Sequence, residues 1–99
     1  MVTRIVKMTF RTDSAETFTA VFERYKKHIR AADGCAHLSL LRDKEHPHIF
    51  FTYSHWENET YLEKYRLSSL FSEVWPQTKA LFSEPAMAWT LNEMAVPSV

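Results

Sequence analysis

The residues best suited to chemistry in this sequence lie close together near its middle. Trp56 follows His55 directly, and Tyr65 and Arg66 come nine and ten residues after the tryptophan. An indole N–H or a phenol O–H donates a hydrogen bond to a substrate oxygen, an imidazole exchanges protons near neutral pH, and a guanidinium binds an anion. These types predict a site for a small molecule that carries oxygen, with Trp56, Tyr65 and His55 as catalytic candidates.

Each candidate also has a structural use, and the sequence leaves both uses open. Trp56 would plug the junction between a strand and the next helix, a use that we favour over catalysis. Tyr65 is a poor base at the usual phenol pKa of about 10, so its chemical role is hydrogen-bond donation, and packing is the simpler role. Arg66 would either contact an anionic substrate or lie on the solvated face of a helix.

The remaining histidines and the single cysteine give weaker signals. His37 and His55 become cross-strand neighbours if a hairpin is centred on His46, and a slip of one residue removes this pairing. Side by side, the two rings would share a proton or bind a metal, and the simpler use of both residues is at an interface or a rim. His46 and His48 have no obvious third ligand nearby, so we expect no metal site. Cys35 lacks a nucleophilic context and is expected to pack as a small apolar residue.

The first third of the chain predicts a strand and a helix. Residues 2–10 alternate between two faces, as in a strand. One face holds Val2, Arg4, Val6, Met8 and Phe10. Asp13 or Ser14 offers the N-cap of a helix, which we expect to end at Asp33-Gly34, where glycine takes the left-handed conformation. The residues at helical spacing, which should face the core, are Phe18, Val21, Phe22, Tyr25 and Ile29.

The rest of the chain predicts three further strands with helices before the last. Strands are expected over residues 35–42 and 48–56, joined as an antiparallel hairpin, and over residues 86–94. A short helix opens at residues 57–59, and a second one begins near Ser68 or Ser69. The order β-α-β-β-α-β predicts an α+β, ferredoxin-like fold with helices on one face of a four-stranded antiparallel sheet.

The second of these late helices carries aromatic residues and a proline. Phe71 and Trp75 fall at core spacing, as do Phe18 and Phe22 in the first helix, and all four are candidates for lining a cavity as well. Pro76 removes one backbone donor, so a kink or a restart of the helix is expected there.

The face of the sheet without helices is predicted to be too apolar for a monomer. Ile49, Phe50 and Phe51 are consecutive, so large apolar side chains project from both faces of their strand. Leaving such a side chain exposed forfeits roughly 1.5–3 kcal/mol. We therefore expect a homodimer that packs sheet against sheet with the helices outside, as a dimeric α+β barrel.

Composition narrows the possible partners. The chain has 99 residues, of which 45% are hydrophobic, and its twelve Lys and Arg equal its twelve Asp and Glu. We expect one domain over residues 1–99 and no nucleic-acid partner, because phosphate binders usually show a basic excess. No stretch approaches the roughly 20 apolar residues of a membrane span, and the first residues do not resemble a secretion signal. A cytoplasmic protein with no membrane partner is the expectation.

Four segments of the sequence match a known family in order and spacing. Asp33-Gly34-Cys35 precedes the second predicted strand, and Leu41-Arg42-Asp43 ends it. Residues 51–59 (Phe-Thr-Tyr-Ser-His-Trp-Glu-Asn-Glu) run through the third strand, and residues 65–71 lie in the helices after it. Over nearly its whole length the chain resembles the antibiotic biosynthesis monooxygenase family, a group of dimeric α+β barrels that includes heme-degrading enzymes.

The resemblance implies a pocket between the sheet and the helices of each subunit. Members with known activity oxidise phenolic or quinol-like aromatics with O₂, without a metal, flavin or other prosthetic group. The electron-rich substrate anion itself gives an electron to O₂, and the protein supplies a dry cavity, a base and groups that stabilise the anion. Many members have a histidine where this chain has Tyr65, and this position is what selects Tyr65 as the hydroxyl candidate. Heme-degrading members have a tryptophan there and an iron-binding histidine at the position of Trp75, so heme degradation is not expected.

The leading hypothesis is therefore a cofactor-independent monooxygenase that acts on a small aromatic or quinol-like substrate. The expected substrate-binding residues are Phe18, Phe22, Phe71, Trp75 and Arg66. The alternative is a non-catalytic dimer on the same scaffold that binds a small ligand. An RNA-binding module of similar shape would need stacking aromatics with basic neighbours on the open sheet face, which we assign to dimerisation instead.

Overall fold

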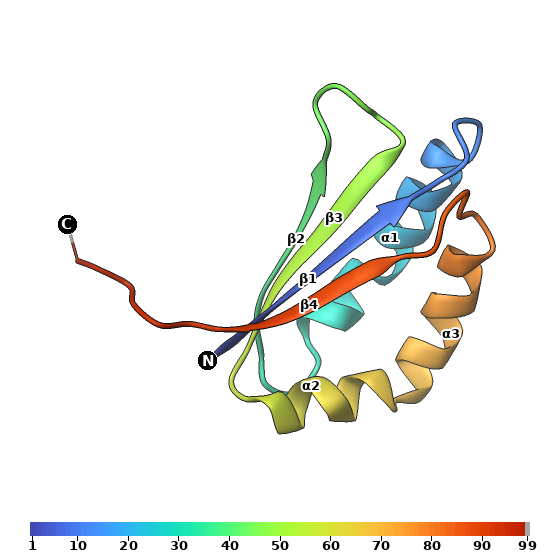
Figure 1. Cartoon of the computed structure of the whole chain (residues 1–99). Coiled ribbons are helices and arrows are strands. Elements are labelled where there is room, and N and C mark those ends of the chain that lie inside the picture. Colours follow the sequence, from blue (N-terminus) through green and yellow to red (C-terminus); the bar gives the residue numbers. More distant parts are fainter. Residues whose placement is uncertain (99) are drawn as a thin grey trace.

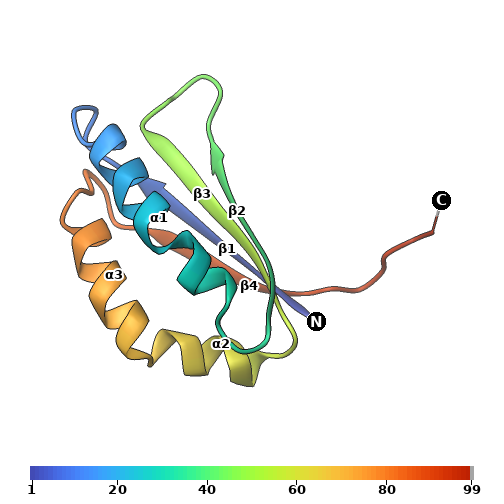
Figure 2. The same ribbon diagram turned by 180° about the vertical axis from the view of Figure 1, so that it is seen from behind.

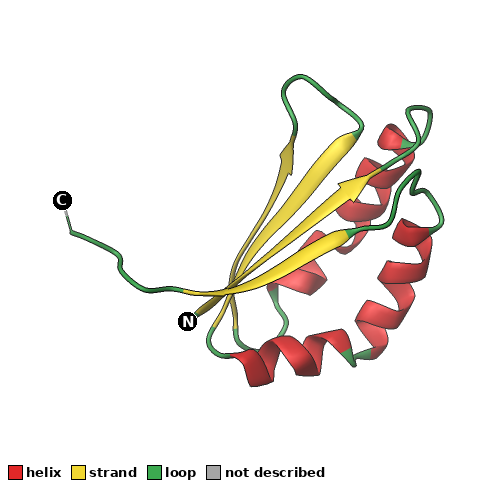
Figure 3. Cartoon of the chain, in the orientation of Figure 1, coloured by secondary structure: helices red, strands yellow, loops and turns green. Residues whose placement is uncertain are grey.

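The computed structural model describes residues 1–98, which form four strands and three helices in the predicted order. The strands are β1 (Val2–Thr9), β2 (Cys35–Arg42), β3 (Ile49–Trp56) and β4 (Met87–Asn92), and the helices are α1 (Ala15–Arg30), α2 (Glu59–Arg66) and α3 (Ser69–Lys79). The strands form one antiparallel sheet in the order β2-β3-β1-β4. All three helices lie on one side of it (Figures 1, 2 and 3). The predicted ferredoxin-like α+β fold is confirmed.

The register of the sheet decides which side chains face the helices. Val2 pairs with Trp56 of β3, and Val6 pairs with Thr52 of β3 and with Ala88 of β4. Residues directly opposite each other share a face, and successive residues alternate between faces. The even-numbered residues of β1, β3 and β4 therefore face the helices, and the odd-numbered residues form the open face.

The core consists of two clusters at opposite ends of the sheet. The first gathers Met8, Phe10, Ala15, Phe18 and Phe50, and the second gathers Val2, Cys35, Trp56 and Leu62. In the first cluster the rings of Phe10 and Phe18 stack with centroids 4.3 Å apart, and Phe50 meets Phe10 edge-on at 5.7 Å. The space between the two clusters is where a site can form.

The end of α1 corrects one prediction. The helix ends at Arg30, before the predicted stop at Asp33-Gly34, and the N–H of Ala31 closes it on the carbonyl of Lys27 at 3.0 Å. Gly34 does take the left-handed conformation, with a φ of +78°. It serves the turn into β2, however, where a Cβ would collide with the ring of Tyr61.

The helix α3 runs through Pro76, so the restart that was one of the two expectations does not occur. The kink stays a prediction. Proline lacks the N–H that would bond the carbonyl of Ser72. Both residues are exposed, so water can satisfy that carbonyl. The helix begins as predicted at Ser68, whose hydroxyl accepts the N–H of Phe71 at 3.2 Å, and Asn58 caps α2 in the same way.

The helices in the described part of the chain are short. The longest, α1, has 16 residues, and none is long and apolar enough to cross a membrane. The cytoplasmic location stays a prediction.

Candidate functional site

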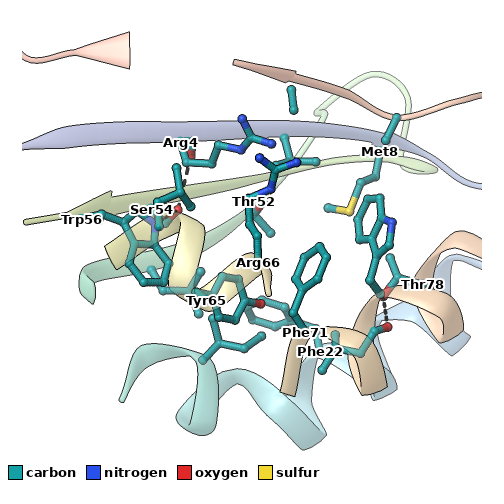
Figure 4. Close-up of a pocket in the computed structure, with 18 of the residues that line it drawn as sticks. Arg4, Met8, Phe22, Thr52, Ser54, Trp56, Tyr65, Arg66, Phe71 and Thr78 are labelled. Carbon is teal, nitrogen blue, oxygen red and sulfur yellow. Dashed lines mark hydrogen bonds between the residues drawn. The ribbon is translucent and has the colours of Figure 1, made fainter. Parts of the chain in front are cut away.

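A cavity of about 340 Å³ lies between the sheet and the helices, in the space between the two core clusters (Figure 4). Met8 and Thr52 of the sheet line one side of it, and Phe22, Phe71 and Trp75 of α1 and α3 line the other. Ligand pockets commonly measure roughly 300–1,000 Å³ and have mostly apolar walls with a few polar groups. This cavity has that size and character.

Trp56 forms one end of the cavity and is held firmly. Its side chain is 1% exposed, and its Nε1–H donates a hydrogen bond to Oγ of Ser54 at 3.0 Å. The ring stacks on that of Tyr65, with centroids 5.2 Å apart and planes 25° from parallel. Because Ser54 already accepts the indole N–H, Trp56 contributes a flat apolar wall in this arrangement.

Tyr65 brings a hydroxyl group into the cavity. The group points into the space between the sheet and the helices (Figure 4). Burial, with a smaller contribution from the Cys35 thiol, raises the pKa of Tyr65 from 10 to about 12. The phenol is therefore protonated at neutral pH, and its chemistry is that of a hydrogen-bond donor, not of a base.

Two guanidinium groups from different elements come together beside the sheet. Arg4 reaches the cavity from β1, and Arg66 reaches it from the last turn of α2 (Figure 4). Nη1 of Arg4 donates to Oγ1 of Thr90 at 2.7 Å, and Nη1 of Arg66 pairs with Oε1 of Glu63 at 3.0 Å. Burial first, and then the positive charge of Arg66, lower the pKa of Arg4. The positive charge of Arg66 therefore disfavours the charged form of Arg4.

The cavity opens toward β4. Ala88 and Thr90 face the helices by register, yet both are exposed. Figures 1 and 3 show α3 standing away from this edge strand, and Ala88 lines the cavity. The mouth therefore lies beside β4, and the hydrogen bond from Arg4 to Thr90 places the guanidinium of Arg4 at it.

Seven of the eight predicted site residues line this cavity: Phe18, Phe22, Trp56, Tyr65, Arg66, Phe71 and Trp75. His55 does not, because strand alternation places it on the open face, opposite to Trp56. There it pairs with His37 in the predicted register, with ring centroids 5.5 Å apart, and its ring lies 4.8 Å from that of Tyr53. A catalytic role for His55 therefore has no place in this cavity.

Several lining residues were missed by the sequence reasoning, and one of them had a signal. Arg4 is the only charged residue on the predicted inner face of the first strand. A cation in that position needs a partner or a function. Thr52, Ser54 and Ala88 also line the cavity, but small residues in a strand give no pattern that distinguishes them.

Among the described residues, the ionisable ones in the cavity wall are Arg4, Arg66 and Tyr65, without a histidine or a carboxylate. Across residues 1–98, no three His, Cys, Asp or Glu side chains gather closely enough to hold a metal ion. Cys35 lies buried in the cluster behind Trp56, where burial raises the pKa of its thiol. The described wall therefore offers hydrogen-bond donors and positive charge, and no base.

The comparisons with known proteins agree with this architecture. Residues 1–75 match the antibiotic biosynthesis monooxygenase family, a stretch that ends inside α3 and includes Arg4, Trp56, Tyr65 and Arg66. No curated protein matches the chain.

Solved structures resemble the whole chain. One is a crystal structure of an antibiotic biosynthesis monooxygenase, with a TM-score of 0.88 and 16% identity over 98% of this chain and 100% of the other. Rv0793 from Mycobacterium tuberculosis has a TM-score of 0.89 and 20% identity over 98% of both chains. PA3566 from Pseudomonas aeruginosa has a TM-score of 0.84 and 22% identity over 95% of this chain and 94% of its own. At these identities the likeness shows the fold alone.

Proposed function

The chain belongs to the antibiotic biosynthesis monooxygenase family, and from this premise we propose that it oxidises a small aromatic or quinol-like molecule with O₂ in its cavity, without a cofactor. The observation that carries the proposal is the cavity itself. Its volume of about 340 Å³ suits a molecule of one to three fused rings, and its walls are largely apolar, with six aromatic side chains among them.

The reaction needs no external reductant, because a phenol can supply all the electrons that O₂ accepts. The phenolate gives one electron to O₂, and the two radicals join at the ring carbon opposite the oxygen to form a hydroperoxide. Loss of water from the hydroperoxide gives a quinone. In total the phenol loses four electrons and two hydrogens, one oxygen atom becomes the new carbonyl, and the other leaves in water.

The residues on which the proposal depends have complementary roles in the proposed reaction. Trp56, Tyr65 and Phe71 form a continuous aromatic wall, with neighbouring centroids 5.2 and 5.4 Å apart, against which a substrate ring packs. The protonated hydroxyl of Tyr65 donates a hydrogen bond to the substrate oxygen and stabilises its anion. The apolar surroundings keep water from the radical pair.

A panel of naphthols, quinols and simple phenols tests the proposal, with O₂ uptake measured on metal-free, flavin-free protein. We expect one O₂ consumed per quinone formed with at least one compound. Ala88→Trp should lower this uptake at least tenfold, because it fills the mouth from an exposed position and leaves the core intact. Leu67→Trp is the matched control, since Leu67 is 85% exposed and lies outside the cavity. Absence of uptake with every compound would contradict the proposal.

A non-catalytic small-ligand-binding module is the second candidate. It is favoured by the lining, which lacks a histidine or a carboxylate to take the substrate proton, and by the Trp56 N–H, which is already bonded to Ser54. On this alternative the same compounds raise the midpoint of thermal unfolding, the Ala88→Trp variant loses that effect, and no O₂ is consumed.

We further propose that the protein is a homodimer formed through the open face of the sheet. Four large apolar side chains on this face, Leu41, Met87, Trp89 and Leu91, are 40–52% exposed. They are odd-numbered residues of β2 and β4, so they project from one surface. A patch of this kind rarely stays in contact with water in a monomer.

Sedimentation velocity over a range of protein concentrations tests the dimer. Trp89→Glu should shift the protein toward the monomer, because it places a charge in the proposed interface. Leu67→Glu adds the same charge at a position remote from the open face and should leave the mass unchanged. A wild-type monomer at high micromolar concentration would refute the dimer.

A further inference from the structure

We propose that Arg4 and Arg66 together bind a carboxylate of the substrate, so that the preferred ligand is an aromatic acid that also carries a hydroxyl group. The inference rests on the proposed function for the fate of the ligand and adds its chemical class. The carboxylate lies at the mouth beside β4, and the ring lies inside against the aromatic wall.

The first supporting observation is the positive charge at the mouth of the cavity. Two guanidinium groups are close enough for one to affect the other's ionisation, and Glu63 is the one carboxylate that contacts either of them among the described residues. Two cations beside one anion leave a net charge of about +1 at the mouth. The charge of the whole chain is zero, so this local excess is a property of the site.

The second support is the position of Arg4 in the sheet. Its neighbours on the same face of β1, Val2 and Val6, are apolar, and the helix side of β1 is core at both ends of the strand. Placing a cation there is unfavourable unless an anion compensates it. Among residues 1–98, its guanidinium donates one hydrogen bond, to the neutral hydroxyl of Thr90. A guanidinium carries five N–H donors, so donors remain for a ligand.

The third support is the geometry of the mouth. Arg66 is 43% exposed. A hydrogen bond to the exposed residue Thr90 holds the guanidinium of Arg4 beside β4. A carboxylate bound between them stays partly hydrated, while its two oxygens match the planar fork of a guanidinium. The ring then packs against the wall formed by Trp56, Tyr65 and Phe71, and the hydroxyl of Tyr65 is available to an oxygen further along the ligand (Figure 4).

The test compares the binding of a hydroxynaphthoate with that of its methyl ester, by calorimetry under argon so that no oxidation occurs. The two probes share ring and hydroxyl and differ in the anion. We expect the acid to bind wild-type protein roughly tenfold to a hundredfold more tightly than the ester. Arg4→Gln and Arg66→Gln should each remove most of this preference while ester binding changes less than threefold.

Lys64→Gln is the matched control, because it removes one exposed cation of α2 that does not line the cavity. It should leave the preference intact. Equal binding of acid and ester, binding of neither, an unchanged preference in Arg66→Gln, or an equal loss in Lys64→Gln would each overturn the inference. Arg66 lies on an exposed helix turn, so the measurement on Arg66→Gln remains informative even if Arg4→Gln folds poorly.

The inference and the proposed function fail in different ways. A strong preference for the acid without O₂ uptake from any compound would leave the anion site standing and would favour the binding module. Oxidation of the ester as fast as the acid, with no difference in affinity, would leave the oxidation standing and would refute the anion site.

Discussion

Replacing Tyr65 by Phe should remove part of the protein's sensitivity to alkali. Burial raises the pKa of this phenol to about 12, whereas in the unfolded chain it is about 10. Between about pH 10 and pH 12 the unfolded chain has released the proton and the folded chain still holds it. The unfolded state then binds fewer protons, so the free energy of unfolding falls as pH rises. A shift of about two pKa units is worth at most about 3 kcal/mol, roughly half of which is lost near pH 11.

Urea unfolding followed by tryptophan fluorescence, at pH values from about 8 to 11, measures this effect. The quantity to compare is the difference in unfolding free energy between wild type and Tyr65→Phe at each pH. Cys35 also has a pKa raised by burial, but it is present in both proteins and largely cancels. We expect a nearly constant difference up to about pH 9 and a change of about 1 kcal/mol in favour of the variant near pH 11.

A difference that stays constant over the whole pH range would refute this reasoning. It would mean that the phenol titrates at its ordinary pKa and is solvated. The role assigned to Tyr65 as a protonated donor in a dry cavity wall would then lose its physical basis.

Four further predictions concern single substitutions, each measured by urea unfolding at neutral pH. Gly34→Ala should destabilise the fold by about 2–4 kcal/mol, because φ is +78° and the added Cβ meets the Tyr61 ring; a loss below about 1 kcal/mol would contradict this. Phe10→Ala should lose about 3–5 kcal/mol, since the ring is 0% exposed and contacts Phe18 and Phe50. Ser68→Ala should lose about 1 kcal/mol with the cap of α3. Arg4→Met should raise the urea midpoint, because it removes a cation that burial and Arg66 both disfavour; a lower midpoint would show that Arg4 is structural.

The fold was predictable because the apolar residues of each helix and strand recur at the spacing typical of that element. Residues 2–10 alternate strictly, and the aromatic residues of α1 recur at helical spacing. The hairpin register was predictable as well, since a turn centred on His46 pairs His37 with His55. These signals are local, and the packing of one sheet face against helices agrees with all of them.

The predictions about helix ends and breaks failed where contacts with other parts of the chain, and not the local sequence, determine the structure. The left-handed glycine was predicted correctly at Gly34, but the end of α1 was set by the turn into β2, which needs the residues between Arg30 and Cys35. The helix α3 continues through Pro76, and because Ser72 is exposed, water can bond the carbonyl that proline leaves without a donor. Neither fact is visible in the sequence around these residues.

The choice of His55 as a catalytic candidate does not fit this cavity, and the alternation of side chains along the strand already indicated as much. If Trp56 faces the helices, its neighbour must face away from them. The same parity placed Arg4 on the inner face of the first strand, in register with Ser54 of β3 and Thr90 of β4. Residue type suggested His55 as a catalytic group, and residue position pointed to Arg4 instead.

Arg4 is where stability and function oppose each other in this structure. An apolar residue at this position would extend the core between Val2 and Met8 and remove the repulsion from Arg66. It would also leave the mouth beside β4 without its half-buried donor. A cation that weakens the folded state and faces a cavity has a physical rationale only if something negative enters that cavity, because the bound anion then offsets the unfavourable burial. On the proposed anion site, a bound carboxylate would add a second negative charge to that of Glu63 and so balance the two guanidinium groups of Arg4 and Arg66.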